Sequence, residues 1–345
     1  MNATRVKLCV MMFLEFFIWG AWLPQIFGYL PSLGFGDWEI WFILGAFNFA
    51  ALLAMFYSTQ FADRTFAAEK FLAFSQFIGG LAILGLFWVK AGWTANVSLP
   101  GGFTFEIHLT FWAFFLLMLV HTLLYVPTIS ITNSIAFANL KDPQKEFGPV
   151  RLWGTIGWIA AATPFIFILV DWDKVATEGA GKTWFEWLGV VLGTAKTGQD
   201  FRTATSYIFV VAGVASLILA AFSLVLPHTP PKPAGKTAEK LAWLEAMKLL
   251  AIPFVLVLFF VTFLDAMVHQ VYFFWTLRYL VDGVGIPGNW APQVMSIGQV
   301  AEIATMAFLG YVLKSLGWRY TMVIGILGHA VRFTDFALVP SALPP

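Results

Sequence analysis

The feature that most constrains this chain is a succession of apolar runs, each long enough to cross a lipid bilayer as a helix. A spanning helix needs about 20 mainly apolar residues. Nine stretches meet this requirement: 8–30, 39–61, 71–90, 109–138, 150–170, 207–226, 249–280, 291–315 and 319–339. Unbroken runs of this length are not barrel strands, and a span must satisfy its own backbone hydrogen bonds. The sequence therefore predicts an all-α integral membrane protein.

The charge content excludes most soluble classes. Only 11% of the residues are charged, against about 25% in a soluble domain. A net charge of +1 offers no field that would attract an anionic polymer, so we expect the lipid bilayer as surroundings and no nucleic-acid partner. The single cysteine, Cys9, excludes an internal disulfide and a Cys-ligated zinc site. No nucleotide, hydrolase or metalloprotease motif is present, so we expect no cofactor, no metal and no enzyme activity.

Loops and charges predict the orientation and the domain plan. Most Lys and Arg fall on one side if the N-terminus is inside, which predicts a cytoplasmic N-terminus in the cell inner (plasma) membrane. The polar connection 171–206 carries an amphipathic patch at 184–191, which we expect on the membrane interface. The Pro-rich, charged stretch 227–248 is expected to be a cytoplasmic linker. It divides a six-helix N-terminal half, 1–226, from a partial C-terminal half, 249–345.

A weak internal repeat supports this division. The segment 13–15 (Phe-Leu-Glu) in the first span resembles 263–265 (Phe-Leu-Asp) in the seventh. Parallel halves of six helices, each built from inverted three-helix repeats, are one known transporter plan. By that plan, the second half of this chain contains three of its six spans.

One stripe of the fifth span is a candidate binding surface. Arg151, Thr155 and Trp158 are spaced i, i+4, i+7 and share a helix face. A guanidinium, a hydroxyl and an aromatic plane suit a ligand with hydroxyls and a flat ring. The alternative is an Arg that extends from a helix end toward the membrane surface.

Two later spans add polar side chains. Gln299 and Glu302 are i, i+3 neighbours in the eighth span. Glu302 is a candidate both for binding hydroxyls and for carrying a proton, because an acid inside a bilayer is costly and usually functional. The alternative for Glu302 is a structural ion pair. Gln270 in the seventh span could donate to and accept from a ligand amide.

Further acids and bases are candidates for proton coupling or gating. Asp265 and His269 are i, i+4 and can pair, either as a structural pair or as a proton-coupling pair. Glu15 in the first span is either a coupling group or a buried structural acid. Asp63 and Arg64 lie in the loop after the second span, and form either a gating latch or a solvated charge pair.

Together these residues resemble the nucleoside:H⁺ symporter family of the major facilitator superfamily, from the first span to the ninth. The specific pieces are 13–15 with 19–23, 125–128 with Asn133, 151–157, 296–299 with Glu302, and 332–333. The resemblance implies a major facilitator superfamily-like helical bundle in which about nine of twelve transmembrane helices are present. It implies proton-coupled uptake of nucleosides by alternating access, with a nucleoside and protons as partners; we also expect a monomer.

The resemblance also implies which residues line the nucleoside site: Arg151, Thr155, Trp158, Gln299 and Glu302. Trp158 stands where the family is expected to have a Phe, and keeps the stacking role. The family also uses two amides in the seventh span. Gln270 matches one of these positions, and Met267 stands at the other.

Three other functions stay open at this point. The same fold could carry another polar solute, such as a sugar. A family member has three further spans, one of which supplies aromatic site residues and an acid linked to proton coupling, so the chain could also be a non-transporting truncated remnant. An intramembrane enzyme using His121 and His269 would need a third partner, which the sequence does not supply.

Overall fold

A computed structural model describes residues 3–57, 66–98, 104–231 and 247–338. Within these ranges, eight helices are long and apolar enough to cross a membrane: Ala3–Ser32, Asp37–Ala54, Ala68–Trp88, Leu109–Asn139, Lys145–Ile168, Gly198–Ser223, Pro253–Gly283 and Tyr311–Leu338. The all-α membrane class predicted from the apolar runs is therefore confirmed. Most of the expected linker 227–248, and the Asp63–Arg64 pair, lie outside the described residues.

The chain divides into two compact units, and each is described by itself. Unit 1 comprises Met1–Asp171 and Ala195–Lys240, and unit 2 comprises Trp172–Thr194 and Leu241–Pro345. The segment Trp172–Thr194 thus groups with the later helices and not with its neighbours in the sequence.

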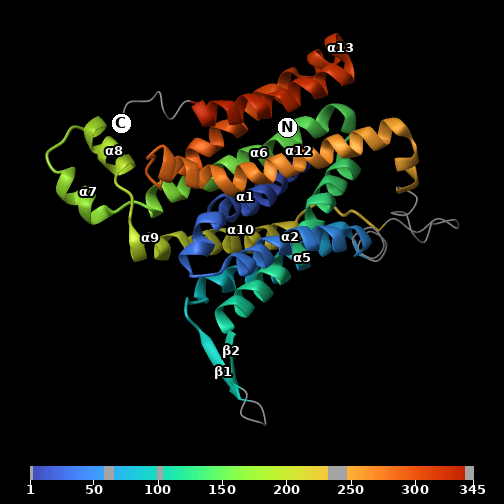
Figure 1. Ribbon diagram of the computed structural model, residues 1–345. Coiled ribbons are helices and arrows are strands. Elements are labelled where there is room, and N and C mark those ends of the chain that lie inside the picture. Colours follow the sequence, from blue (N-terminus) through green and yellow to red (C-terminus); the bar gives the residue numbers. More distant parts are fainter. Residues whose placement is uncertain (1–2, 58–65, 99–103, 232–246, 339–345) are drawn as a thin grey trace. The chain divides into compact units, whose positions relative to one another are not determined.

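Unit 1 is a helical bundle centred on its first helix (Figure 1). Its long helices are α1 (Ala3–Ser32), α2 (Asp37–Tyr57), α4 (Ala68–Gly85), α5 (Leu109–Asn139), α6 (Pro143–Ile168) and α10 (Tyr207–Ser223). Helix α1 packs against α5, α6 and α10, while α4 packs between α5 and α10, and α2 covers α5. Aromatic rings fill the space between them: Phe209 lies edge-on to both Tyr29 and Phe114, at 5.4 and 5.6 Å.

Glycines bring α1 and α6 into backbone contact. A methyl group on Gly157 would overlap the carbonyl oxygen of Phe13, and one on Gly20 would lie 2.8 Å from the carbonyl oxygen of Trp158. Small residues at such crossings let membrane helices approach closely, where dispersion forces and not the hydrophobic effect drive packing. The position of α6 therefore depends on these glycines.

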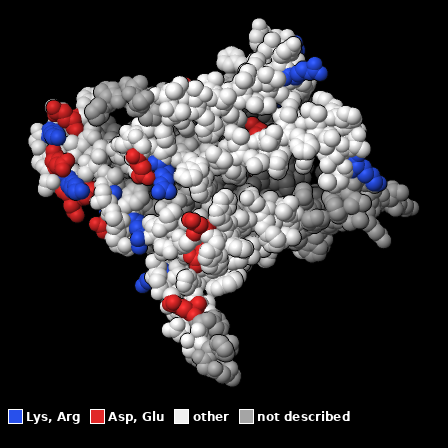
Figure 2. Space-filling view, viewed as in Figure 1, with Lys and Arg blue, Asp and Glu red and all other residues white. Residues whose placement is uncertain are grey.

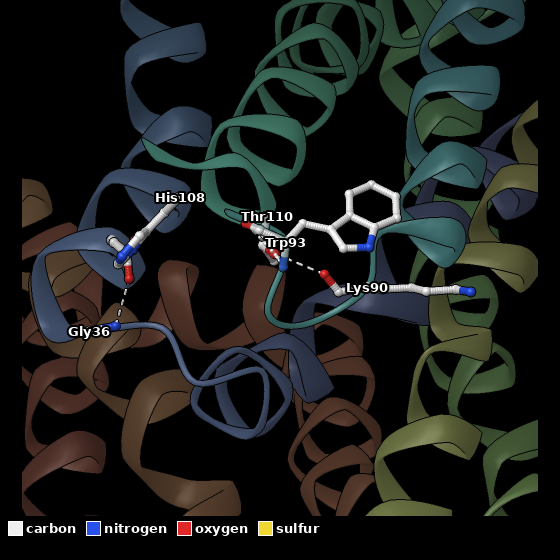
Figure 3. A network of polar contacts seen from close by, with 6 residues as sticks. Gly36, Lys90, Trp93, His108 and Thr110 are labelled. Atoms are coloured by element: carbon white, nitrogen blue, oxygen red, sulfur yellow. Dashed lines mark hydrogen bonds and ion pairs between the residues drawn. The ribbon is translucent and has the colours of Figure 1, made fainter. Parts of the chain in front are cut away.

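The polar segment after α4 is a β-hairpin, which the sequence analysis did not predict. A short 3-10 helix, η2 (Leu86–Trp88), is followed by strands β1 (Thr94–Ser98) and β2 (Thr104–His108), paired antiparallel with Thr94 opposite His108. Figure 1 shows the hairpin projecting beyond the ends of α2 and α5. At its base, the Thr110 hydroxyl donates to the Lys90 carbonyl at 2.8 Å and accepts from the Trp93 N–H at 2.9 Å (Figure 3).

A second contact ties the hairpin to α2. The buried carboxylate of Glu39 accepts a hydrogen bond from the Gly36 N–H at 2.8 Å and lies 3.0 Å from Nδ1 of the exposed His108 ring (Figure 3). His108 ends β2, and α5 begins at the next residue. The starts of α2 and α5 are therefore joined through this acid.

The connection 171–206 forms three short helices. They are α7 (Trp172–Glu178), α8 (Trp184–Gly193) and α9 (Gly198–Thr205). The amphipathic patch 184–191 is thus helical; a capping box between Thr183 and Glu186 starts α8, and hydrogen bonds from Thr183 hold the pKa of the Glu186 carboxyl below its usual range. On the face in Figure 2, charged side chains gather over this polar segment, while the long helices present a nearly uncharged surface.

Unit 2 contains two long helical elements besides α7 and α8. They are α12 (Pro253–Arg278), which continues as a π-helical turn, η4 (Tyr279–Gly283), and α13 (Ala291–Leu338); η3 (Leu249–Ala251) precedes them. Helix α13 breaks at Gly317, whose φ of 72° is left-handed, so the element has two helical parts, as we expected for 291–315 and 319–339. The last of the eight apolar spans, Tyr311–Leu338, includes this break. The described residues therefore contain eight such spans, and the ninth, expected over 291–315, stays a prediction.

We predict that Gly157→Ala destabilises unit 1 by about 1–3 kcal/mol, because an overpacked contact forces backbone shifts. Thermal unfolding of the detergent-solubilised protein measures this. Gly148→Ala, on the same helix, is the matched control, because a methyl group there meets open space. Equal stability of the two variants would contradict the close crossing of α1 and α6.

Candidate substrate site

The predicted stripe on α6 meets the aromatic face of α1. The Arg151 guanidinium carbon lies 3.8 Å from the centre of the Phe16 ring, and the Trp158 ring stands edge-on to Trp19 at 5.4 Å. Thr155, between them on the same helix face, is only 5% exposed. The structure thus brings the three residues together as their spacing predicted, and adds Phe16 and Trp19 to the set.

The aromatic surface continues from α1 onto α2. Trp19 stacks on Phe47 with ring centres 5.2 Å apart and an interplanar angle of 14°. Three rings, Trp158, Trp19 and Phe47, therefore form a row across three helices. Phe47 was missed by the sequence analysis, because nothing in an apolar run indicates which of its rings faces a neighbouring helix.

A glycine creates the space for the arginine. A methyl group on Gly154 would lie 2.7 Å from both Nη1 of Arg151 and Cδ2 of Phe16. The glycine three residues after Arg151 therefore lets the guanidinium lie over the ring. A cation–π contact of this kind contributes about 0.5–2 kcal/mol, and a planar guanidinium can stack on a ring while its edge donates hydrogen bonds.

The other predicted binding residues belong to unit 2. Gln270 is exposed on α12, and the first part of α13 carries the half-buried Gln299 and the exposed Glu302. Because this part of α13 is helical, Gln299 and Glu302 share a face, as their i, i+3 spacing predicted.

The predicted pairing of Asp265 has a different partner in the structure. Asp265 Oδ1 lies 2.9 Å from Nε2 of His329 on α13, while the His269 ring packs edge-on against Phe273 at 4.9 Å. The hydrogen bond of Asp265 is therefore to His329, while Asp265 and His269 interact electrostatically. His329 was overlooked in the sequence, although it stands three residues before Arg332, whose guanidinium lies 4.7 Å from the Tyr272 ring centre.

Three of the predicted proton-coupling and gating residues remain: Glu15, Asp63 and Arg64. Glu15 is fully buried in α1 and is hydrogen-bonded to side chains of α4 and α5. Asp63 and Arg64 lie outside the described residues. Within the described ranges, no group of three or more His, Cys, Asp or Glu could hold a metal ion.

A bundle of long apolar helices with a polar and aromatic stripe inside it is typical of a membrane transporter. The family model described as "Nucleoside H+ symporter" matches residues 1–179 and 187–343. The chain is 34% identical over 335 residues to the provisionally named nucleoside transporter YegT of Escherichia coli (strain K12), covering 96% of this chain and 68% of YegT. The chain therefore belongs to the nucleoside H⁺ symporter family.

More distant relatives agree with this assignment. The xanthosine permease of Escherichia coli (strain K12) is 24% identical over 347 residues, which cover 96% of this chain and 71% of the permease. The crystal structure of the nucleoside transporter NupG superimposes with a TM-score of 0.69 at 23% identity, covering 98% of this chain and 74% of NupG. The likeness to NupG shows the fold.

We predict that Asp265 and His329 are energetically coupled. Asp265→Asn and His329→Gln should each lower the free energy of unfolding, and the double variant should lose less than their sum by about 0.2–1 kcal/mol, as for partly exposed ion pairs. His269→Gln combined with Asp265→Asn is the matched comparison and should show the smaller coupling, because Asp265 and His269 interact electrostatically, whereas a hydrogen bond joins Asp265 to His329. Coupling to His269 in place of His329 would refute the pairing.

Proposed function

We propose that the protein carries nucleosides across the cell inner membrane together with protons, by alternating access of its two units to the two sides. Membership of the nucleoside H⁺ symporter family supports nucleoside transport and proton coupling. The observation that carries the proposal at the level of residues is the stripe of Arg151, Thr155 and Trp158, set against the rings of α1. We further propose a monomer with a cytoplasmic N-terminus.

In this proposal the nucleoside base stacks on Trp158. The Trp158 ring is held by its edge contact with Trp19, which is itself stacked on Phe47, so the platform is rigid before the base arrives. Stacking on an aromatic ring is worth about 1–3 kcal/mol per base. Arg151 donates hydrogen bonds to sugar hydroxyls or base edges, and Thr155 both donates and accepts.

Unit 2 supplies the remaining polar contacts in this proposal. Gln270 and Gln299 recognise polar edges of the nucleoside, and Glu302 accepts from hydroxyls and carries a proton. Asp265, His269 and Glu15 are further proton-coupling candidates. Asp63 and Arg64 are proposed as a gating latch in the loop after α2.

We expect Trp158→Ala to weaken nucleoside binding about 10- to 100-fold, the equivalent of the stacking energy, and Trp158→Phe to retain most of it. Arg151→Ala should abolish uptake of labelled nucleoside into proteoliposomes. Trp153→Ala is the matched control, because Trp153 lies on the same helix and is 40% exposed.

Competition between substrates separates this proposal from its rivals. Unlabelled nucleosides should block uptake, and sugars should not. Inhibition by sugars alone would replace the nucleoside with another polar solute. Absence of any uptake by the folded protein would favour a non-transporting remnant.

A further inference from the structure

A closed polar cluster lies inside unit 1. At its centre is Glu15, in the middle of α1, with 0% of its surface exposed. Three other helices reach it: Gln76 from α4, Tyr125 and Thr128 from α5, and Ser216, through Gln76, from α10. An acid in such a place must be neutral or compensated, because a bare buried carboxylate costs several kcal/mol.

Each carboxyl oxygen of Glu15 has one neutral partner. Oε1 lies 2.7 Å from the Thr128 hydroxyl, and Oε2 accepts from Nε2 of Gln76 at 3.0 Å. The second N–H of Gln76 Nε2 donates to Thr128 Oγ1, also at 3.0 Å. Neither partner carries a charge, so a negative charge on the carboxyl group would be compensated by hydrogen bonds from neutral groups alone.

Counting hydrogens at Thr128 indicates where the proton lies. Its hydroxyl is within hydrogen-bond distance of two acceptors, Glu15 Oε1 and the Tyr125 carbonyl at 2.5 Å, but it has one hydrogen to donate. If Glu15 is protonated, its O–H donates to Thr128, and Thr128 donates onward to Tyr125. Each short contact of Thr128 then has one hydrogen.

The remaining hydrogen bonds of the cluster join uncharged groups. Ser216 donates to Gln76 Oε1 at 2.6 Å, which fixes the orientation of the Gln76 amide. The Tyr125 hydroxyl donates to the Glu15 carbonyl at 2.6 Å. Fully satisfied polar networks of this kind are the form that a membrane interior tolerates.

The ionisable groups on the surrounding helices are few. On α5, His121 is bonded through Nδ1 to the Gly79 carbonyl, and Tyr125 is in the cluster itself. Helices α4 and α10 have ionisable side chains only near their starts, at Glu69, Lys70 and Tyr207. Helix α6 carries Arg151, whose guanidinium covers Phe16, the residue next to Glu15.

We propose that Glu15 is a neutral carboxylic acid that donates its proton to Thr128, and that it is the proton-carrying group of unit 1. The proton leaves Glu15 for water on the inner side and is replaced from water on the outer side. The carrier role rests on the proposed function, whereas the protonation does not.

Infrared spectroscopy of the purified protein tests the protonation directly. A carboxylic-acid C=O band at neutral pH should be present in the wild type and absent from Glu15→Gln. Glu39→Gln makes the same change at another buried acid, which has a histidine partner, and should leave that band in place. A wild-type spectrum in which Glu15 contributes only carboxylate bands would overturn the proposal.

Transport in proteoliposomes tests the carrier role. Glu15→Gln can donate to Thr128 as the acid does, so it should keep nucleoside exchange without a gradient and lose accumulation driven by a pH gradient. Glu15→Asp should keep accumulation with a shifted pH profile, which guards against loss of fold in the first variant. Accumulation by Glu15→Gln equal to wild type would overturn the carrier role. If the wild type neither exchanges nor accumulates nucleosides, the proposed function and the carrier role both fail, while the infrared band still decides the protonation.

Discussion

The close crossing of α1 and α6 is the contact on which the rest of unit 1 depends. Glycines on both helices remove the side chains that would hold the backbones apart. Because the helices meet there, the rings of α1 stand directly against the polar stripe of α6. The same helix α1 presents its other side to α5 and α10, so one element joins the stripe proposed for the nucleoside to the polar cluster.

The two polar regions of unit 1 differ in whether their buried polar atoms have hydrogen-bond partners. Around Glu15 each donor has an acceptor inside the protein, and the carboxyl group itself is fully buried. Along α1 and α5, by contrast, five buried polar atoms lack hydrogen-bond partners among the described residues: Nε of Arg5, Nε1 of Trp19, Nε1 of Trp22, Nε2 of His121 and Oδ1 of Asn133. Buried polar atoms without partners are uncommon in well-packed cores. Of these residues, Trp19 stands beside the stripe that we propose for the nucleoside.

The sequence predicted the positions of the helices better than the contacts between residues that are far apart in the chain. Apolar length alone located the long helices, and helical spacing alone put Arg151, Thr155 and Trp158 on one face, because both are local properties of the chain. The second partner of Asp265 was missed for the same reason: i, i+4 spacing points to His269, whereas His329 comes close only when α12 and α13 pack. Phe47 and Gln76 are likewise defined by neighbours far away in the sequence. The hairpin was missed because strands 94–98 and 104–108 are short and weakly patterned.

That hairpin has a consequence for how the protein can be observed. A two-stranded sheet leaves its outer edges unpaired, which a hydrocarbon environment does not allow, so β1 and β2 must stand in water. The ribbon runs straight into α5 and is fastened to α2 through Glu39. A change in the angle between α2 and α5 should therefore change the orientation of the hairpin, which lies on the aqueous side. A pair of spectroscopic labels on the ribbon and on the start of α2 could follow that angle through a cycle without touching the interior.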